Sequence, residues 1–128
     1  SLKEKLETFV HPYVMRQIDT EITEFKSSRT IALLFVEAAL HYEAGAERLF
    51  DYMIVVDADE HVRMDRVMVR DSTTLPEIMQ RMQAQMPPGE KMAKADFIIR
   101  NNDDLASLKT RRKLIFTLLH AMALGAHN

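Results

Sequence analysis

Residues 50–71 (FDYMIVVDADEHVRMDRVMVRD) and 81–102 (RMQAQMPPGEKMAKADFIIRNN) decide the fold of this chain. Each stretch contains a short apolar run, at 53–56 and 97–99, that ends abruptly in polar residues. The segment between the two runs is rich in Arg, Gln and Met and has helical spacing. This layout predicts two strands of a buried parallel sheet, with a mobile basic flap between them that folds over an anionic ligand.

The apolar run IALLFV at 31–36 predicts a third strand, covered on both faces. In front of it we expect two helices separated by a break at His11-Pro12, because proline interrupts a helix interior. The alternation of helices and strands predicts an α/β fold with a three-stranded parallel sheet. The 128 residues suit a single domain, 1–128, in which 72–95 form a helical insertion.

Local signals predict where the later helices begin and end. Asp59 is a candidate cap for a helix that turns Val62, Val67 and Val69 inward. Thr74 and Glu77 have the spacing of a capping box. Further signals are the break at Pro87-Pro88-Gly89, a cap at Asp103 or Asp104, and Gly125 just past the end of the last helix.

The composition excludes several classes of function. A formal net charge of −2 favours neither nucleic acid nor a membrane surface as partner. The absence of cysteine excludes disulfides and thiolate chemistry. No two of the five histidines are three or four residues apart, so we expect no metal site. No stretch has the length of a membrane span and no signal peptide opens the chain, so we expect a cytoplasmic protein.

Polar residues follow all three predicted strands: Glu37, Asp57, and the run Arg100-Asn101-Asn102. Ligands of open parallel sheets bind just beyond the carboxyl ends of the strands. These residues are therefore candidates for a binding site. The alternative is that they only terminate buried strands.

A basic cluster lies in the helical segments. Arg66 and Arg70 are four residues apart and share a helix face, with Arg63 one turn earlier. Guanidinium groups bind phosphate oxygens bidentately, so this cluster, with Arg81, Lys91 and Lys94, could hold a polyphosphate. The alternative is a solvated face paired with neighbouring acidic residues.

The three glycines, at 45, 89 and 125, exclude both GxxxxGK[ST] and GxGxxG from this sequence. The chain therefore contains no local loop for cradling β- and γ-phosphates. We expect no catalytic residue in it and no kinase activity from it alone.

Four motifs taken together resemble dephospho-coenzyme A kinases, which are P-loop kinases. They are HP at 11–12, EAALHYE at 37–43, RD at 70–71 followed by RMQAQ at 81–85, and ADFIIRN at 95–101. The resemblance implies a truncated P-loop kinase-like parallel sheet with a helical lid at 72–95, in a kinase or a fragment of one. It also implies ATP-dependent phosphorylation of the 3′-hydroxyl of dephospho-coenzyme A, with ATP and Mg²⁺ used by the complete enzyme and nothing held tightly by this chain.

The resemblance also implies roles for particular residues. Arg70 and Arg81 would close on the ATP phosphates from the lid, and Asn101 and Asn102 would lie beside the adenine. The side chains implied to border the substrate pocket are His11, Glu37, Leu40, His41, Tyr42 and Glu43. Glu37 and Ala39 replace an aspartate and a proline that are usual in that motif.

Three alternatives remain open on the sequence: a kinase or kinase fragment, a non-catalytic nucleotide- or coenzyme A-binding or regulatory module, and a product with no ligand. Without a central strand, the predicted sheet would leave strand edges unpaired. We therefore expect self-association or pairing with a complementary segment that carries a P-loop.

Overall fold

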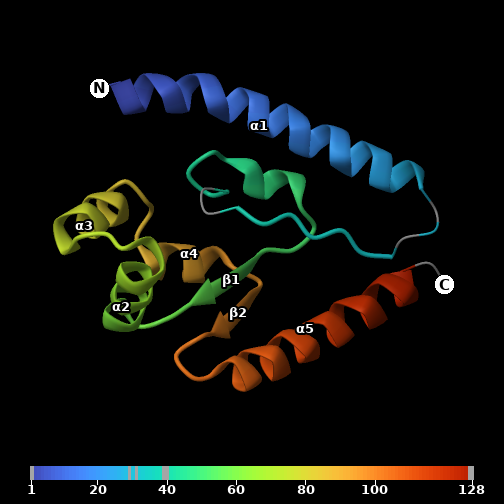
Figure 1. Ribbon diagram of the computed structural model, residues 1–128. Helices are drawn as coiled ribbons and strands as arrows, with labels where there is room; N and C mark the ends of the chain where they lie inside the picture. Colours follow the sequence, from blue (N-terminus) through green and yellow to red (C-terminus); the bar gives the residue numbers. More distant parts are fainter. Residues whose placement is uncertain (1, 29, 31, 39–40, 127–128) are drawn as a thin grey trace. The chain divides into compact units, whose positions relative to one another are not determined.

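The computed structural model describes residues 2–28, 30, 32–38 and 41–126, and the chain divides into two compact units (Figure 1). One unit comprises residues 50–117 and the other comprises residues 1–49 and 118–128. The organisation of the chain as a single domain therefore stays a prediction.

The unit at 50–117 contains a parallel pair of strands, β1 (Ile54–Asp57) and β2 (Phe97–Arg100). Ile54 pairs with Phe97 at one end of the register and Asp57 with Arg100 at the other. Ile99 of β2 is buried, whereas Val56 of β1 is exposed. The α/β class with a parallel sheet, read from the two apolar runs, is confirmed.

Three helices connect the strands: α2 (Glu60–Asp71), α3 (Leu75–Gln83) and α4 (Pro88–Lys94). In this unit α3 packs against α2, and α4 packs against β1 (Figure 1). The predicted capping box is present, because the Glu77 carboxylate accepts a hydrogen bond from the Thr74 backbone N–H at 3.3 Å. Ile78, one residue further on, is buried. Residues 84–87 separate α3 from α4, so of the predicted break at 87–89 only Pro87 lies between the helices, and Pro88 and Gly89 form the first turn of α4.

Two predictions about α2 are wrong. Val69 is 84% exposed instead of facing inward, although Val62 and Val67 are half-buried. Val67 and Val69 lie about 200° apart around the helix, so one inward face cannot hold both side chains. Asp59 is the residue before the helix, but its side chain makes no capping hydrogen bond.

The other unit begins with α1 (Leu2–Ser27), a single helix that continues through Pro12. The predicted break at His11-Pro12 is therefore wrong. Proline removes one backbone hydrogen bond at a cost of about 3 kcal/mol, and in a helix of 26 residues the remaining turns retain theirs. A short 3-10 helix, η1 (Ala46–Leu49), follows the described turn at 41–45. Buried side chains of this unit are Ile18, Tyr42, Ala46 and Leu119.

The predicted third strand at 31–36 is also wrong for the residues described there, because residues 32–38 form no strand. A strand exists only when its backbone groups pair with a neighbour. Here the Val36 carbonyl instead accepts a hydrogen bond from the His41 ring, Nε2 to O 2.9 Å. Leu34 and Phe35 are exposed, by 38% and 54%. The run is therefore not covered on both faces, and the described part of the chain has a two-stranded sheet.

The last helix, α5 (Leu105–Ala126), begins where Asp104 caps it: the Ser107 backbone N–H donates to Asp104 Oδ1 at 2.8 Å. This hydrogen bond lowers the pKa of the Asp104 carboxyl. Gly125 lies inside the helix, so its prediction as a terminator is wrong. A glycine costs a helix only about 1 kcal/mol, too little to end it.

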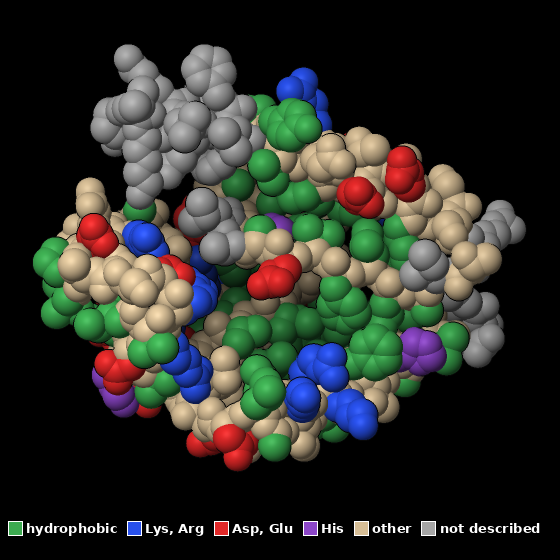
Figure 2. All heavy atoms as spheres, viewed as in Figure 1, with side chains coloured by type: hydrophobic (Ala, Val, Ile, Leu, Met, Phe, Trp, Pro, Cys, Tyr) green, Lys and Arg blue, Asp and Glu red, His purple; other side chains and the backbone are tan. Residues whose placement is uncertain are grey.

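Large hydrophobic side chains reach the surface in several places (Figure 2). Val56 and Ile98 are exposed on the strands, and Leu105, Leu114 and Leu124 on α5. Among the described residues, no helix is both long enough and apolar enough to cross a lipid bilayer.

Candidate functional site

The polar ends of β1 and β2 lie together, as the parallel register requires. Asp57 is 8% exposed, and its carboxylate accepts a hydrogen bond from Arg100 Nη1 at 2.6 Å. The Asn101 backbone N–H extends the pairing by donating to the Asp57 carbonyl at 2.7 Å. Two of the three predicted strand ends therefore form one site. The third, Glu37, is exposed and follows no described strand.

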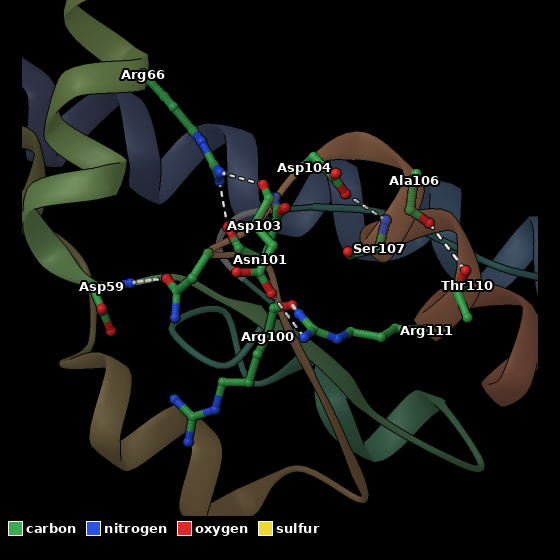
Figure 3. A network of polar contacts seen from close by, with 11 residues as sticks. Asp59, Arg66, Arg100, Asn101, Asp103, Asp104, Ala106, Ser107, Thr110 and Arg111 are labelled. Atoms are coloured by element: carbon green, nitrogen blue, oxygen red, sulfur yellow. Dashed lines mark hydrogen bonds and ion pairs between the residues drawn. The ribbon is translucent and has the colours of Figure 1, made fainter.

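Arginines from two helices hold the loop that follows β2 (Figure 3). Arg66 of α2 donates to the carbonyl of Asn101 and, at 3.2 Å, to that of Asp103. Arg111 of α5 donates to the carbonyl of Arg100 and, at 2.9 Å, to the Asp103 carboxylate. We call the loop at 100–103 with these two arginines the loop clasp.

The loop clasp uses the two predicted adenine-side residues differently. Asn102 Oδ1 accepts a hydrogen bond from the Asp59 backbone N–H at 2.6 Å, so the Asn102 amide joins the β2 end to the start of α2 (Figure 3). The Asn101 side chain is half-buried and makes no hydrogen bond within the described residues, which leaves its amide available to a ligand.

The predicted basic cluster is divided by the structure. Arg66 binds backbone carbonyls of the loop after β2, although its spacing predicted that it acts together with Arg70. Arg63, one turn before Arg66, is half-buried, and its buried Nε has no acceptor among the described residues. Sequence reasoning missed Arg111, because nothing in its neighbourhood marks a residue that binds a carbonyl eleven positions earlier.

The two predicted lid arginines converge on one carboxylate. Arg70, in the last turn of α2, donates from Nε and Nη2 to the two oxygens of Asp71, at 2.7 and 2.9 Å. Arg81, in the last turn of α3, donates from Nη1 to Asp71 Oδ2 at 3.0 Å. We call Arg70 and Arg81 the lid arginine pair. The arrangement offers two guanidinium groups at one exposed place.

Electrostatics follow from these contacts. The hydrogen bond from Arg70, supported by Arg81, lowers the pKa of the Asp71 carboxyl to about 2, and Asp71 in turn raises the pKa of Arg70. The carboxylate is therefore ionised throughout the neutral range. Glu77 also has a lowered pKa, first because the Thr73 hydroxyl donates to it and then because the Thr74 backbone N–H does.

The turn between α2 and α3 brings the two arginines together. Ser72 ends α2 in the left-handed region, with φ 49° and ψ 39°, which reverses the chain. Few residues other than glycine adopt this conformation readily. The capping box at Thr74 and Glu77 then fixes the first turn of α3. Arg81 lies about two turns after the cap residue Thr74.

The predicted substrate residues fall in the unit at 1–49 and 118–128. His41, Tyr42 and Glu43 lie in a turn closed by hydrogen bonds from the backbone N–H of Gly45 to the Tyr42 carbonyl and of Ala46 to the His41 carbonyl, at 3.0 and 2.8 Å. Gly45 has φ +68°, which favours glycine at this position. Tyr42 is buried and Glu43 half-buried. Leu40 and the side chain of His11 lie outside the described residues.

A metal site is not formed by the acidic and histidine residues that the structure describes, since no three or more of them are gathered closely enough to hold an ion.

Comparison with known proteins identifies relatives of this chain. A profile of the family described as "Dephospho-CoA kinase" matches residues 1–107. The dephospho-CoA kinase of Geobacter sulfurreducens is 34% identical over 111 residues, which cover 87% of this chain and 56% of the relative. That of Syntrophotalea carbinolica is 37% identical over 93 residues, which cover 73% and 43%. The chain thus spans about half the length of the curated relatives it matches.

Solved structures agree with these matches. The crystal structure of TT1252 from Thermus thermophilus superposes with a TM-score of 0.72 at 31% identity, covering 91% of this chain and 59% of that one. The dephospho-CoA kinase from Campylobacter jejuni gives a TM-score of 0.58 at 28% identity, covering 93% and 58%. The helices and strands described above therefore also occur in a solved dephospho-CoA kinase.

Proposed function

Since the chain belongs to the dephospho-CoA kinase family, we propose that it serves in the ATP-dependent phosphorylation of the ribose 3′-hydroxyl of dephospho-CoA. The observation that carries this proposal is the family match over residues 1–107. The sequence has no GxxxxGK[ST] motif, so the reaction also needs a segment that supplies the phosphate loop. We propose that this segment is the partner of the chain.

In this proposal the lid arginine pair acts on ATP. Arg70 and Arg81 bind phosphate oxygens and offset the charge that moves during transfer. Their convergence from two helices supports this role, because a polyphosphate is best held by several donors that already point to one place.

Asn101 and Asn102 are proposed to border the adenine. The free Asn101 amide could bind the base edge, whereas Asn102 would act by holding the β2 end to α2. The residues proposed to border dephospho-CoA are His11, Glu37, Leu40, His41, Tyr42 and Glu43. His41 Nε2–H donates to the Val36 carbonyl, which holds the ring against the turn.

Mg²⁺ enters the proposal with ATP. Within the part of the chain that the structure describes, no cluster of acidic or histidine side chains fits the ion, and we assign it no ligand here. No step of the reaction is routed through it.

The proposal is tested by restoring the phosphate loop. The N-terminal segment of the Geobacter sulfurreducens relative is fused ahead of this chain, and ATP consumption is measured with and without dephospho-CoA. We expect turnover that depends on dephospho-CoA. A fusion that folds cooperatively but shows no such turnover would contradict the proposal.

The alternative is a non-catalytic module that binds nucleotide or coenzyme A. Calorimetry of the 128-residue chain distinguishes the two functions. Tight binding of dephospho-CoA or ATP by the chain, together with a fusion that has no activity, would support the module. Weak binding with an active fusion would support the kinase.

A further inference from the structure

We propose that Asp71 is a positioning residue that gathers Arg70 and Arg81 into a preformed binding site for a polyphosphate. This inference rests on the proposed function, in which both arginines contact ATP phosphates, and it adds the residue that arranges them. Asp71 touches no substrate in this account and acts through its two neighbours.

The contacts leave each guanidinium with donors to spare. Arg70 uses Nε and Nη2 on Asp71, and Arg81 uses only Nη1. Their side chains are 72% and 55% exposed, so the remaining N–H groups face solvent. The Asp71 side chain is only 27% exposed and lies between them. An incoming anion therefore meets two guanidinium groups that are already oriented by the same carboxylate.

A carboxylate is needed at this place because two positive side chains repel each other. Arg70 and Arg81 lie eleven positions apart on different helices, and within the described residues Asp71 is the acidic side chain that both of them bind. An arginine loses considerable side-chain entropy when a ligand immobilises it. If Asp71 has already restricted both side chains, less side-chain conformational entropy is lost when the anion binds.

A positioning role and a pure charge effect of Asp71 predict opposite changes in anion affinity when its charge is removed. Removing the Asp71 charge raises the local positive charge, so a point-charge argument predicts tighter binding of an anion. If Asp71 positions the arginines, its loss weakens binding in spite of the added positive charge. Asp65 is a matched control, because it lies on the same helix, is exposed and makes no ion pair within the described residues.

The experiment measures binding of inorganic tripolyphosphate to the 128-residue chain by calorimetry. The variants are Asp71→Asn, Asp71→Glu, Asp65→Asn and Arg81→Ala. We expect Asp71→Asn to weaken binding about five-fold or more and Arg81→Ala by a similar factor. Asp65→Asn should leave the affinity unchanged or slightly higher. Asp71→Glu keeps the carboxylate one methylene further out, and its affinity should fall between those of the wild type and Asp71→Asn.

A second readout needs no ligand. The Nε–H signals of arginine in nitrogen-15 NMR report how strongly each guanidinium is held. In Asp71→Asn we expect that of Arg70, which donates from Nε to Asp71, to exchange faster with solvent, while that of Arg66 is unchanged. Circular dichroism checks that each variant is folded, and Asp71→Glu preserves the test if Asp71→Asn is not.

Three results would overturn the inference. They are equal or tighter binding by Asp71→Asn, equal binding by Arg81→Ala, and no binding of tripolyphosphate by the wild-type chain. Each is separate from the failure of the proposed function, which is decided by turnover of the fusion with dephospho-CoA.

Discussion

The loop clasp gives a stability prediction that compares two arginines one helical turn apart. Arg66→Met and Arg63→Met both remove a guanidinium and keep most of the apolar stem, so the packing lost is similar. Arg66 donates to two backbone carbonyls of the loop clasp. Arg63 has a buried Nε without an acceptor among the described residues. The two substitutions should therefore differ sharply in their effect on the free energy of unfolding.

The magnitude follows from the contacts. A hydrogen bond to a charged group contributes about 1.5–3 kcal/mol when it is buried. Arg66 is exposed, so water competes for the guanidinium, and we take about 0.5–1 kcal/mol for each of its bonds. Arg66→Met should then lower the free energy of unfolding by roughly 1–2 kcal/mol. Arg63→Met should change it by less than about 0.5 kcal/mol or raise it, since an unpaired buried donor is removed.

Urea unfolding followed by circular dichroism is a suitable assay, because the chain has no tryptophan. With a slope of about 1–2 kcal/mol per molar urea, Arg66→Met should lower the midpoint by roughly 1 M. Amide exchange at Ile99 localises the effect to β2. The reasoning is refuted if Arg66→Met unfolds at the wild-type midpoint, or if Arg63→Met loses as much stability as Arg66→Met.

Three further predictions concern the lid and the sheet. In the fusion that carries a phosphate loop, Arg81→Ala should lower turnover ten-fold or more and change stability by less than about 0.5 kcal/mol; unchanged turnover would remove Arg81 from the lid. The Asp71 carboxyl should titrate with a pKa of about 2 in carbon-13 NMR, below its ordinary pKa of 3.8. Its contribution to stability is therefore complete above pH 3.8 and is lost as the pH falls through about 2. Titration near 3.8 would contradict the ion pair. The isolated chain should sediment as a dimer or larger species, because the described two-stranded sheet has unpaired edges; a sharp monomer peak with a cooperative melt would argue against this.

Much of the α/β part of the fold could be predicted because local signals and tertiary packing agree there. The runs at 53–56 and 97–99 become β1 and β2, since each finds the other as a partner. The capping box at Thr74 forms as its spacing requires. The run at 31–36 has an equally apolar pattern and forms no strand at 32–38. Its failure reflects the absence of a pairing partner, which a local pattern does not reveal.

The candidate site could be predicted only in part, for a similar reason. The parallel register brings Asp57 and Arg100 together, and that follows from two strand ends alone. The destination of each arginine does not follow from spacing, because Arg66 reaches a loop 35 residues later in the chain. The convergence of Arg70 and Arg81 on Asp71 depends on the left-handed turn at Ser72, a conformation that serine seldom adopts.

The chemistry of the fused protein tests the central claim most directly. Phosphorus-31 NMR of a reaction with ATP and dephospho-CoA distinguishes transfer to the ribose from simple hydrolysis of ATP. The account predicts a new phosphate monoester resonance from the ribose 3′-phosphate. Its integral should correspond to one monoester for each ADP formed. Formation of ADP with inorganic phosphate alone, from a fusion that folds and binds both substrates, would contradict it.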